Sequence, residues 1–142
     1  MTEPERVKAT VNEYIAAVHE LMRSKPWSDG LLGLGKLPGR DAVHERYYHT
    51  LYKEIASAAA SGLSAQEAFE VCSYLLSAER ESNESVMVKT MLIAFQGLIV
   101  PLIPMLTDDQ RQELLRSLDM SYPPRRRLPC QNEIALLLAK RG

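Results

Sequence analysis

The chain has 142 residues, of which 46% are hydrophobic and 25% are charged, the composition of an ordinary globular protein of one domain. Its formal net charge of -1 provides no overall field that would attract nucleic acid or an anionic membrane. Two cysteines far apart in the sequence, Cys72 and Cys130, exclude a disulfide framework and a cysteine metal cluster.

The N-terminal segment, MTEPERVKAT, contains acidic side chains and no apolar core, which excludes a secretory signal. Nothing in the sequence indicates export, so we expect a cytoplasmic protein. Thr2 and Glu5 fit a capping box, and apolar residues then recur at helical spacing as far as Leu21. The first helix is therefore expected to end before Pro26.

A loop is expected over residues 26–39, because four glycines and Pro38 interrupt the helical pattern. These glycines and Lys36 fit a phosphate-binding loop only in part, since no Ser or Thr follows the lysine and no strand precedes the loop. A packed loop is the favoured interpretation, with Trp27 and Leu31 among its apolar residues.

The pattern predicts a second helix from Arg40 to a glycine cap at Gly62. Its apolar face consists of Val43, Tyr47, Leu51, Ile55 and Ala58. A third helix is expected after a capping box of Ser64 and Glu67, and the polar run RESNES separates it from the fourth. The apolar side of the third helix carries Cys72, which we expect to be a core thiol.

A fourth, almost wholly apolar helix is predicted from Val86 to Pro101, at the centre of the fold. Residues 90–106 form an uncharged stretch of 17 residues, the lower edge of a membrane span. Because Pro101 and Pro104 interrupt this stretch, a buried central helix is favoured over a membrane segment.

A fifth helix is predicted to begin at Thr107, capped by Gln110, and a short last helix to run from about Asn132 to Lys140. Between them, SYPPRRRLP predicts an extended, proline-stiffened segment. The predicted fold is an all-α, single-domain bundle of five to six helices over residues 1–142, with a buried central helix and a basic C-terminal segment, 121–142.

The second helix holds most of the residues that could carry chemistry. Four of them recur at steps of three or four and so share one face: Asp41, Glu45, His49 and Tyr52. The usual zinc pattern of two histidines four residues apart is missing, because His44 and His49 are five apart. A solvated, charge-paired face is favoured, and neither a metal nor another cofactor is expected. Arg40, His44 and His49 leave a small hydrolase or nuclease as one alternative.

The C-terminal segment supports a stronger alternative, a nucleic-acid-binding regulator that uses Arg125, Arg126 and Arg127. Three adjacent arginines are suited to contacting phosphates, and equally to docking on an acidic protein surface. Since no aromatic residue lies among them, nucleic acid is expected to bind only weakly.

No catalytic constellation emerges, so the predicted function is binding to another protein as a regulator, adaptor, inhibitor or immunity-type protein without catalytic activity. Tyrosines on the second helix support this function, because a tyrosine exposes an apolar ring with a polar tip. The expected contact residues are Trp27, Leu31, His44, Glu45, Tyr48 and Tyr52. Homo-oligomer formation through the same surface remains open.

Overall fold

The computed structural model describes residues 1–24 and 37–140, and every regular element within them is helical. The α-helices are α1 (Glu3–Ser24), α2 (Arg40–Ala60), α3 (Ala65–Glu81), α4 (Val86–Ile93), α5 (Asp108–Ser121) and α6 (Pro129–Ala139). Two 3₁₀ helices, η2 (Gln96–Met105) and η3 (Pro124–Arg126), complete the fold. The predicted all-α bundle is therefore confirmed.

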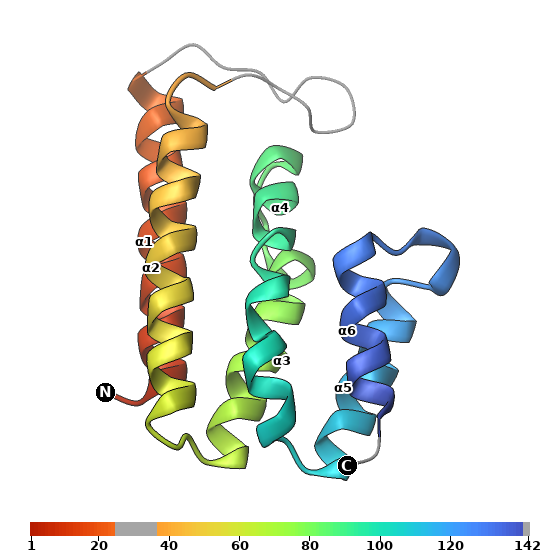
Figure 1. The fold of residues 1–142 in the computed structure, drawn as a ribbon. Helices are drawn as coiled ribbons and strands as arrows, with labels where there is room; N and C mark the ends of the chain where they lie inside the picture. Colours follow the sequence, from red (N-terminus) through yellow and green to blue (C-terminus); the bar gives the residue numbers. More distant parts are fainter. Residues whose placement is uncertain (25–36, 141–142) are drawn as a thin grey trace.

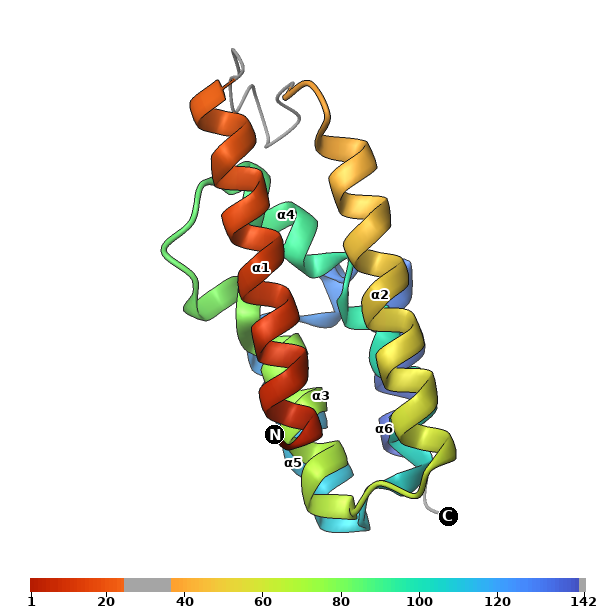
Figure 2. The same ribbon diagram turned by 90° about the vertical axis from the view of Figure 1, so that its left-hand side faces the viewer.

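The helices are arranged as three successive groups along the chain (Figure 1). α1 and α2 form a long antiparallel pair, α3 packs against α4 and η2, and α5 and α6 form the last pair. Figure 2 shows the α1–α2 pair in front of the other helices. The segment η2 occupies the middle of this arrangement, since it contacts α2, α3 and α6.

Local capping fixes several helix ends at the predicted residues. The Thr107 hydroxyl accepts a hydrogen bond from the Gln110 backbone N–H at 3.2 Å, and the Gln110 side-chain oxygen accepts one from the Thr107 N–H at 3.0 Å. Thr2 and Glu5 form the same reciprocal pair at the start of α1. Gly62 follows α2 with a φ of 86°, a conformation that glycine adopts without strain.

The predicted fourth helix is wrong beyond Ile93. The α-helix ends there, and after a two-residue turn the chain continues as a 3₁₀ helix as far as Met105. Within an α-helix, Pro101 would lack its hydrogen bond and its ring would clash with the carbonyl four residues earlier. Side chains three residues apart eclipse in a 3₁₀ helix, so Pro101 and Pro104 share its exposed side.

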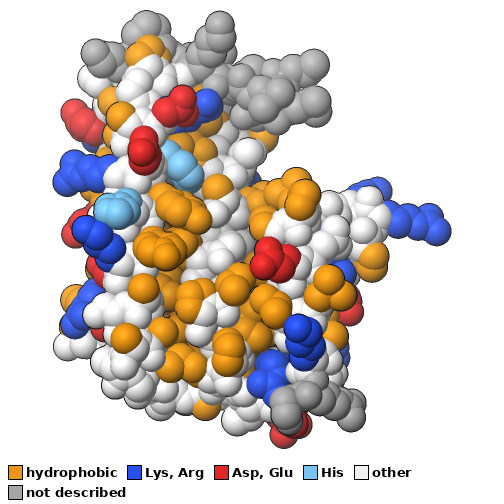
Figure 3. All heavy atoms as spheres, viewed as in Figure 1, with side chains coloured by type: hydrophobic (Ala, Val, Ile, Leu, Met, Phe, Trp, Pro, Cys, Tyr) orange, Lys and Arg blue, Asp and Glu red, His pale blue; other side chains and the backbone are white. Residues whose placement is uncertain are grey.

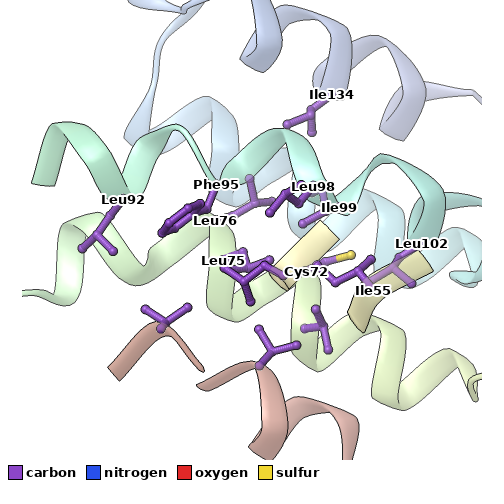
Figure 4. Packing of buried hydrophobic residues seen from close by; sticks show 14 of the residues in the cluster. Ile55, Cys72, Leu75, Leu76, Leu92, Phe95, Leu98, Ile99, Leu102 and Ile134 are labelled. Carbon is purple, nitrogen blue, oxygen red and sulfur yellow. The ribbon is translucent and has the colours of Figure 1, made fainter. Parts of the chain in front are cut away.

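The core lies largely between α3 and the α4–η2 segment (Figure 4). Phe95 and Ile99 are fully buried there against Leu75 and Cys72 of α3, and Ile134 of α6 approaches η2 from the other side. Val86, Pro101 and Pro104 are exposed, so this segment is central but one of its sides reaches the surface.

Residues Val86–Met105 are long and apolar enough to cross a membrane. In the structure they are divided between α4 and η2 and pack against α2, α3 and α6. Packing against three helices is typical of a core segment, as the favoured prediction of a central position implies.

The C-terminal part also departs from the prediction. α6 begins at Pro129, three residues before Asn132, because proline at the first helical position needs no N–H partner. The Gln131 side chain supports this start by accepting a hydrogen bond from the Leu128 N–H at 3.0 Å. The segment before it is not extended throughout, since η3 forms a 3₁₀ turn. Likewise, α3 includes the first two residues of RESNES and ends at Glu81.

Candidate protein-binding groove

The tyrosines of α2 divide between the core and the surface. Tyr48 is 37% exposed and Tyr52 is 54% exposed, whereas Leu51 is fully buried. Tyr47 is half-buried and packs edge-to-face on Tyr14, with 5.7 Å between the ring centroids. The helical periodicity predicts this placement. Glu45 is exposed, while Trp27, Leu31 and the glycine-rich loop lie outside the described residues.

Tyr48 and Tyr52 form one wall of an apolar groove between α2 and α6, with η2 as its floor. Figure 3 shows hydrophobic side chains gathered on this face. One hollow of about 260 Å³ is lined by Tyr48, Tyr52, Ile55, Ala56, Gly97, Leu98, Val100 and Pro101. A second, of about 360 Å³, is lined by Val100, Ile103, Pro104, Arg111, Leu137 and Lys140. The two hollows adjoin at Val100, and together they are called here the α2–η2–α6 groove.

The floor of this groove offers side-chain contacts and few backbone hydrogen bonds. Pro101 and Pro104 have no backbone N–H, and η2 uses its own backbone in helical turns. At the rim, the Arg111 guanidinium donates to the Leu106 carbonyl at 2.7 Å and pairs with Asp108. The groove is therefore suited to apolar side chains and not to an added β-strand.

His44 lies half-buried one helical turn before Tyr48. Its ring stacks on Phe95, with 5.1 Å between centroids and 11° between planes. Its Nδ1 lies 3.1 Å from the buried Tyr14 hydroxyl. Burial lowers the pKa of His44 and raises the pKa of Tyr14, so both side chains are uncharged at neutral pH. Tyr14 is not among the residues predicted for this site. The signal that could have indicated it is a tyrosine on the apolar stripe of the first helix, because its buried hydroxyl needs a hydrogen-bond partner.

The predicted polar face of α2 is exposed, including Asp41, Glu45 and His49. The remaining histidine of the chain, His19 on α1, pairs with Glu84, with 2.8 Å between Nε2 and Oε2. Across residues 1–24 and 37–140, no three His, Cys, Asp or Glu side chains come together to hold a metal ion.

Of the residues considered for a hydrolase, Arg40 and His44 line one hollow, but His49 does not join them. His44 faces Tyr14 and Phe95, whereas His49 lies on the exposed side of α2. Burial raises the pKa of the Cys72 thiol to about 12, so it remains protonated in the core.

Only part of the predicted basic tail is exposed. Arg125 and Arg126 lie at the surface on η3, but the Arg127 side chain is only 7% exposed. Arg127 donates to the Tyr122 carbonyl at 2.7 Å and forms an ion pair with Asp119. Of the three arginines, α5 therefore holds Arg127 and leaves Arg125 and Arg126 at the surface.

A buried polar network, not predicted from the sequence, positions the α6 wall of the groove. The Gln131 side chain of α6 donates to the Gln96 side-chain oxygen of η2 at 2.9 Å, and both residues are buried. The Gln96 amide donates to the Tyr122 hydroxyl at 3.3 Å, and that hydroxyl donates to Glu79 at 2.7 Å. Burial raises the pKa of Tyr122 to about 12, which keeps this donor protonated.

No family model, curated protein or solved structure matches this chain.

Proposed function

We propose that the protein is a non-catalytic regulator or adaptor, of the inhibitor or immunity type, that binds another protein. Its contact surface is the α2–η2–α6 groove, and the occupant is an amphipathic helix of the partner. The observation that carries this proposal is the pair of adjoining apolar hollows, which extends from Tyr52 through Val100 to Leu137. Exposed apolar surface of this kind marks binding sites in soluble proteins.

The geometry favours a helix as occupant. α2 and α6 both pack on η2 and leave the surface between them open, so a further helix would complete the layer. Two adjoining hollows suit two apolar side chains on one helix face, three to seven residues apart. The exposed Lys140 at the rim favours an acidic residue beside that apolar stripe.

A second copy of the chain is the alternative occupant. It would make the protein a homo-oligomer through the same tyrosine wall. The cytoplasm is the location that we propose for either complex.

Site-specific photo-crosslinking tests the proposal. A benzophenone side chain at Ala56, which lines the groove, is expected to give one discrete adduct in cells. The matched control is the same side chain at Asn12, exposed on α1. Mass spectrometry of the adduct identifies the partner, or shows twice the mass of the chain if a second copy is bound.

Affinity measurements with the purified partner complete the test. Tyr48→Ala and Leu137→Ala should each weaken binding about tenfold, equivalent to about 1.4 kcal/mol, since truncated interface anchors cost this much or more. Asn12→Ala should leave the affinity unchanged. Equal adducts at Ala56 and Asn12, or groove variants that bind like the wild type, would show that the groove is not the contact surface.

A further inference from the structure

Gly97 lies on the floor of the α2–η2–α6 groove, beside the wall formed by Tyr48 and Tyr52. It is the second residue of η2 and lines the hollow of about 260 Å³. Three residues make one turn of a 3₁₀ helix, so Gly97, Val100 and Ile103 form one row along η2. Val100 and Ile103 occupy this row with branched side chains, whereas its end at Gly97 has none. The hollow therefore lies where the floor lacks a side chain.

The fold does not require a glycine at position 97. Gly39 and Gly62 have φ values of 87° and 86°, but Gly97 is outside this left-handed region. A methyl group added to Gly97 would meet no atom within 4 Å in the described part of the chain. Glycine is also less favourable than alanine inside a helix, because it loses more conformational entropy on folding. An open hollow for a ligand accounts for this residue, whereas backbone geometry and packing do not.

The walls of the hollow are suited to an aromatic ring. The Tyr48 ring stacks on the buried Phe95, with 6.2 Å between centroids and 30° between planes, so its position is fixed before any partner binds. Tyr52 adds a second ring one helical turn further along α2, and Ile55 and Pro101 add apolar surface. A ring that enters beside these two tyrosines gains ring-to-ring contacts, which are favourable beyond the area that they bury.

We propose that this hollow receives an aromatic side chain of the partner's helix, and that Gly97 keeps the hollow open for that ring. The helix is the occupant of the proposed function, on which this inference rests. From Gly97 to Ile103 the groove extends about 12 Å, at a rise of about 2.0 Å per residue. An α-helix covers that length in about eight residues, or two turns. Lys140 lines the second hollow with Ile103, so its charge favours an acidic residue about two turns from the ring.

Nuclear magnetic resonance on the isolated protein tests the preference for a ring. The probes are N-acetyl-phenylalaninamide and N-acetyl-leucinamide, whose side chains gain similar free energies on burial. Only the first has a ring, and it should bind at least about threefold more tightly, because ring pairs add to the effect of buried area. It should shift the Gly97 amide and the Tyr48 and Tyr52 ring signals to saturation. Equal affinity for the two probes, or no saturable shift at these residues, would overturn the proposal.

A substitution that fills the hollow tests the role of Gly97. Gly97→Val places a branched side chain there and should weaken the binding of N-acetyl-phenylalaninamide at least about tenfold. The matched control is Ser57→Val, at an exposed position of α2 outside the hollow, and it should leave the affinity unchanged. Thermal unfolding of both variants confirms that they fold. Unchanged affinity in a folded Gly97→Val would show that the ring does not enter at this position.

Gly97→Ala separates the effect on binding from the effect on folding. It should raise the Tm by about 1–4 °C, because alanine restricts the unfolded chain at a position whose folded conformation it can adopt. It should also weaken probe binding, though less than Gly97→Val does. A lower Tm would show that the fold needs this glycine and would overturn the proposal.

These experiments separate the aromatic hollow from the function of the groove. A partner crosslinked at Ala56, together with equal affinity for the two probes, would uphold the proposed function and overturn the preference for a ring. Binding selective for the ring, together with equal adducts at Ala56 and Asn12, would support the aromatic hollow and contradict the helix-binding function.

Discussion

At the residue scale, polar side chains placed against the apolar core are held by specific partners. His44 is fixed by Tyr14 and Phe95, and Gln96 is fixed by Gln131 and Tyr122. A buried polar group without a partner costs about 1–3 kcal/mol, so each of these contacts affects the stability of the fold. Two substitution experiments measure that effect.

The first concerns the pH dependence of stability. Because burial lowers the pKa of His44, the unfolded chain binds more protons than the folded protein just below about pH 6.5, where a free imidazole titrates. Stability should therefore fall as the pH decreases through this range, while above it His44 is neutral in both states and contributes no slope. His44→Phe should lose less stability than the wild type between about pH 7.5 and pH 5.5, as measured by urea unfolding. The control is His49→Gln at an exposed position, whose stability should change with pH as that of the wild type does. The same pH dependence of stability in all three proteins would contradict the prediction.

The second concerns the Gln96–Gln131 hydrogen bond. Gln131→Leu leaves the buried Gln96 oxygen without this donor and should destabilise the fold by about 1–3 kcal/mol. Adding Gln96→Leu removes the side-chain oxygen that lost its donor. The double variant should therefore lose less free energy of unfolding than the sum of the losses of the two single variants. A double-mutant cycle by chemical denaturation should give a coupling energy of at least about 0.5 kcal/mol. Additive effects would show that the two amides do not depend on each other.

At the scale of elements, local signals predicted most of the fold. Thr107 with Gln110 and Ser64 with Glu67 marked helix starts, because capping needs only residues three apart in the sequence. Because proline disrupts an α-helix, Pro101 indicated that the fourth α-helix must stop. Nothing in the local sequence indicated that the chain would continue as η2, packed against α3. Pro129 was expected to belong to an extended segment, whereas it begins α6.

Only the α2 wall of the α2–η2–α6 groove could be predicted from the sequence. The periodicity of α2 predicts Tyr48 and Tyr52 at the boundary of its buried face, because the direction of each side chain around the helix axis depends on that helix alone. The opposite wall depends on how α6 docks on η2 through the Gln96–Gln131 contact, 35 residues apart in the sequence. No local pattern reports a contact of that separation, so Leu137 was not predicted.

The prolines of η2 provide a prediction at this scale. Both lie on the exposed side of a 3₁₀ segment whose backbone accommodates proline without strain. Their main effect on stability is therefore to reduce the conformational entropy of the unfolded chain. Pro101→Ala and Pro104→Ala should each lower stability by about 0.4–1 kcal/mol in thermal unfolding. Far-ultraviolet circular dichroism should show unchanged helicity. Increased stability with more α-helix would indicate that the prolines hold η2 in a strained form.

At the scale of the whole molecule, charge is distributed unevenly, with a basic C-terminal segment beside an acidic body. Since α5 holds Arg127, only Arg125 and Arg126 of the arginine run are exposed. Two phosphate contacts predict a slope of about -2 for log K against log salt concentration on duplex DNA. Fluorescence anisotropy across a salt series measures this slope. The double variant Arg125→Ala, Arg126→Ala should abolish the dependence of DNA binding on salt. The control Arg127→Ala should change that dependence little. A slope steeper than about -4 in the wild type would contradict the prediction, because it would indicate a larger basic face.

The docking of α6 on η2 has a consequence for synthesis on the ribosome. The surface of η2 that faces Ile134 is translated before the helix that covers it. At about 5–20 residues per second, the segment from Thr107 to Ala139 takes about 2–7 s to make. During that interval the nascent chain presents Gln96 and its apolar neighbours without the α6 cover. A chaperone that binds apolar segments has seconds in which to act on this protein, and a ribosome that stalls before α6 releases a chain with an uncovered core.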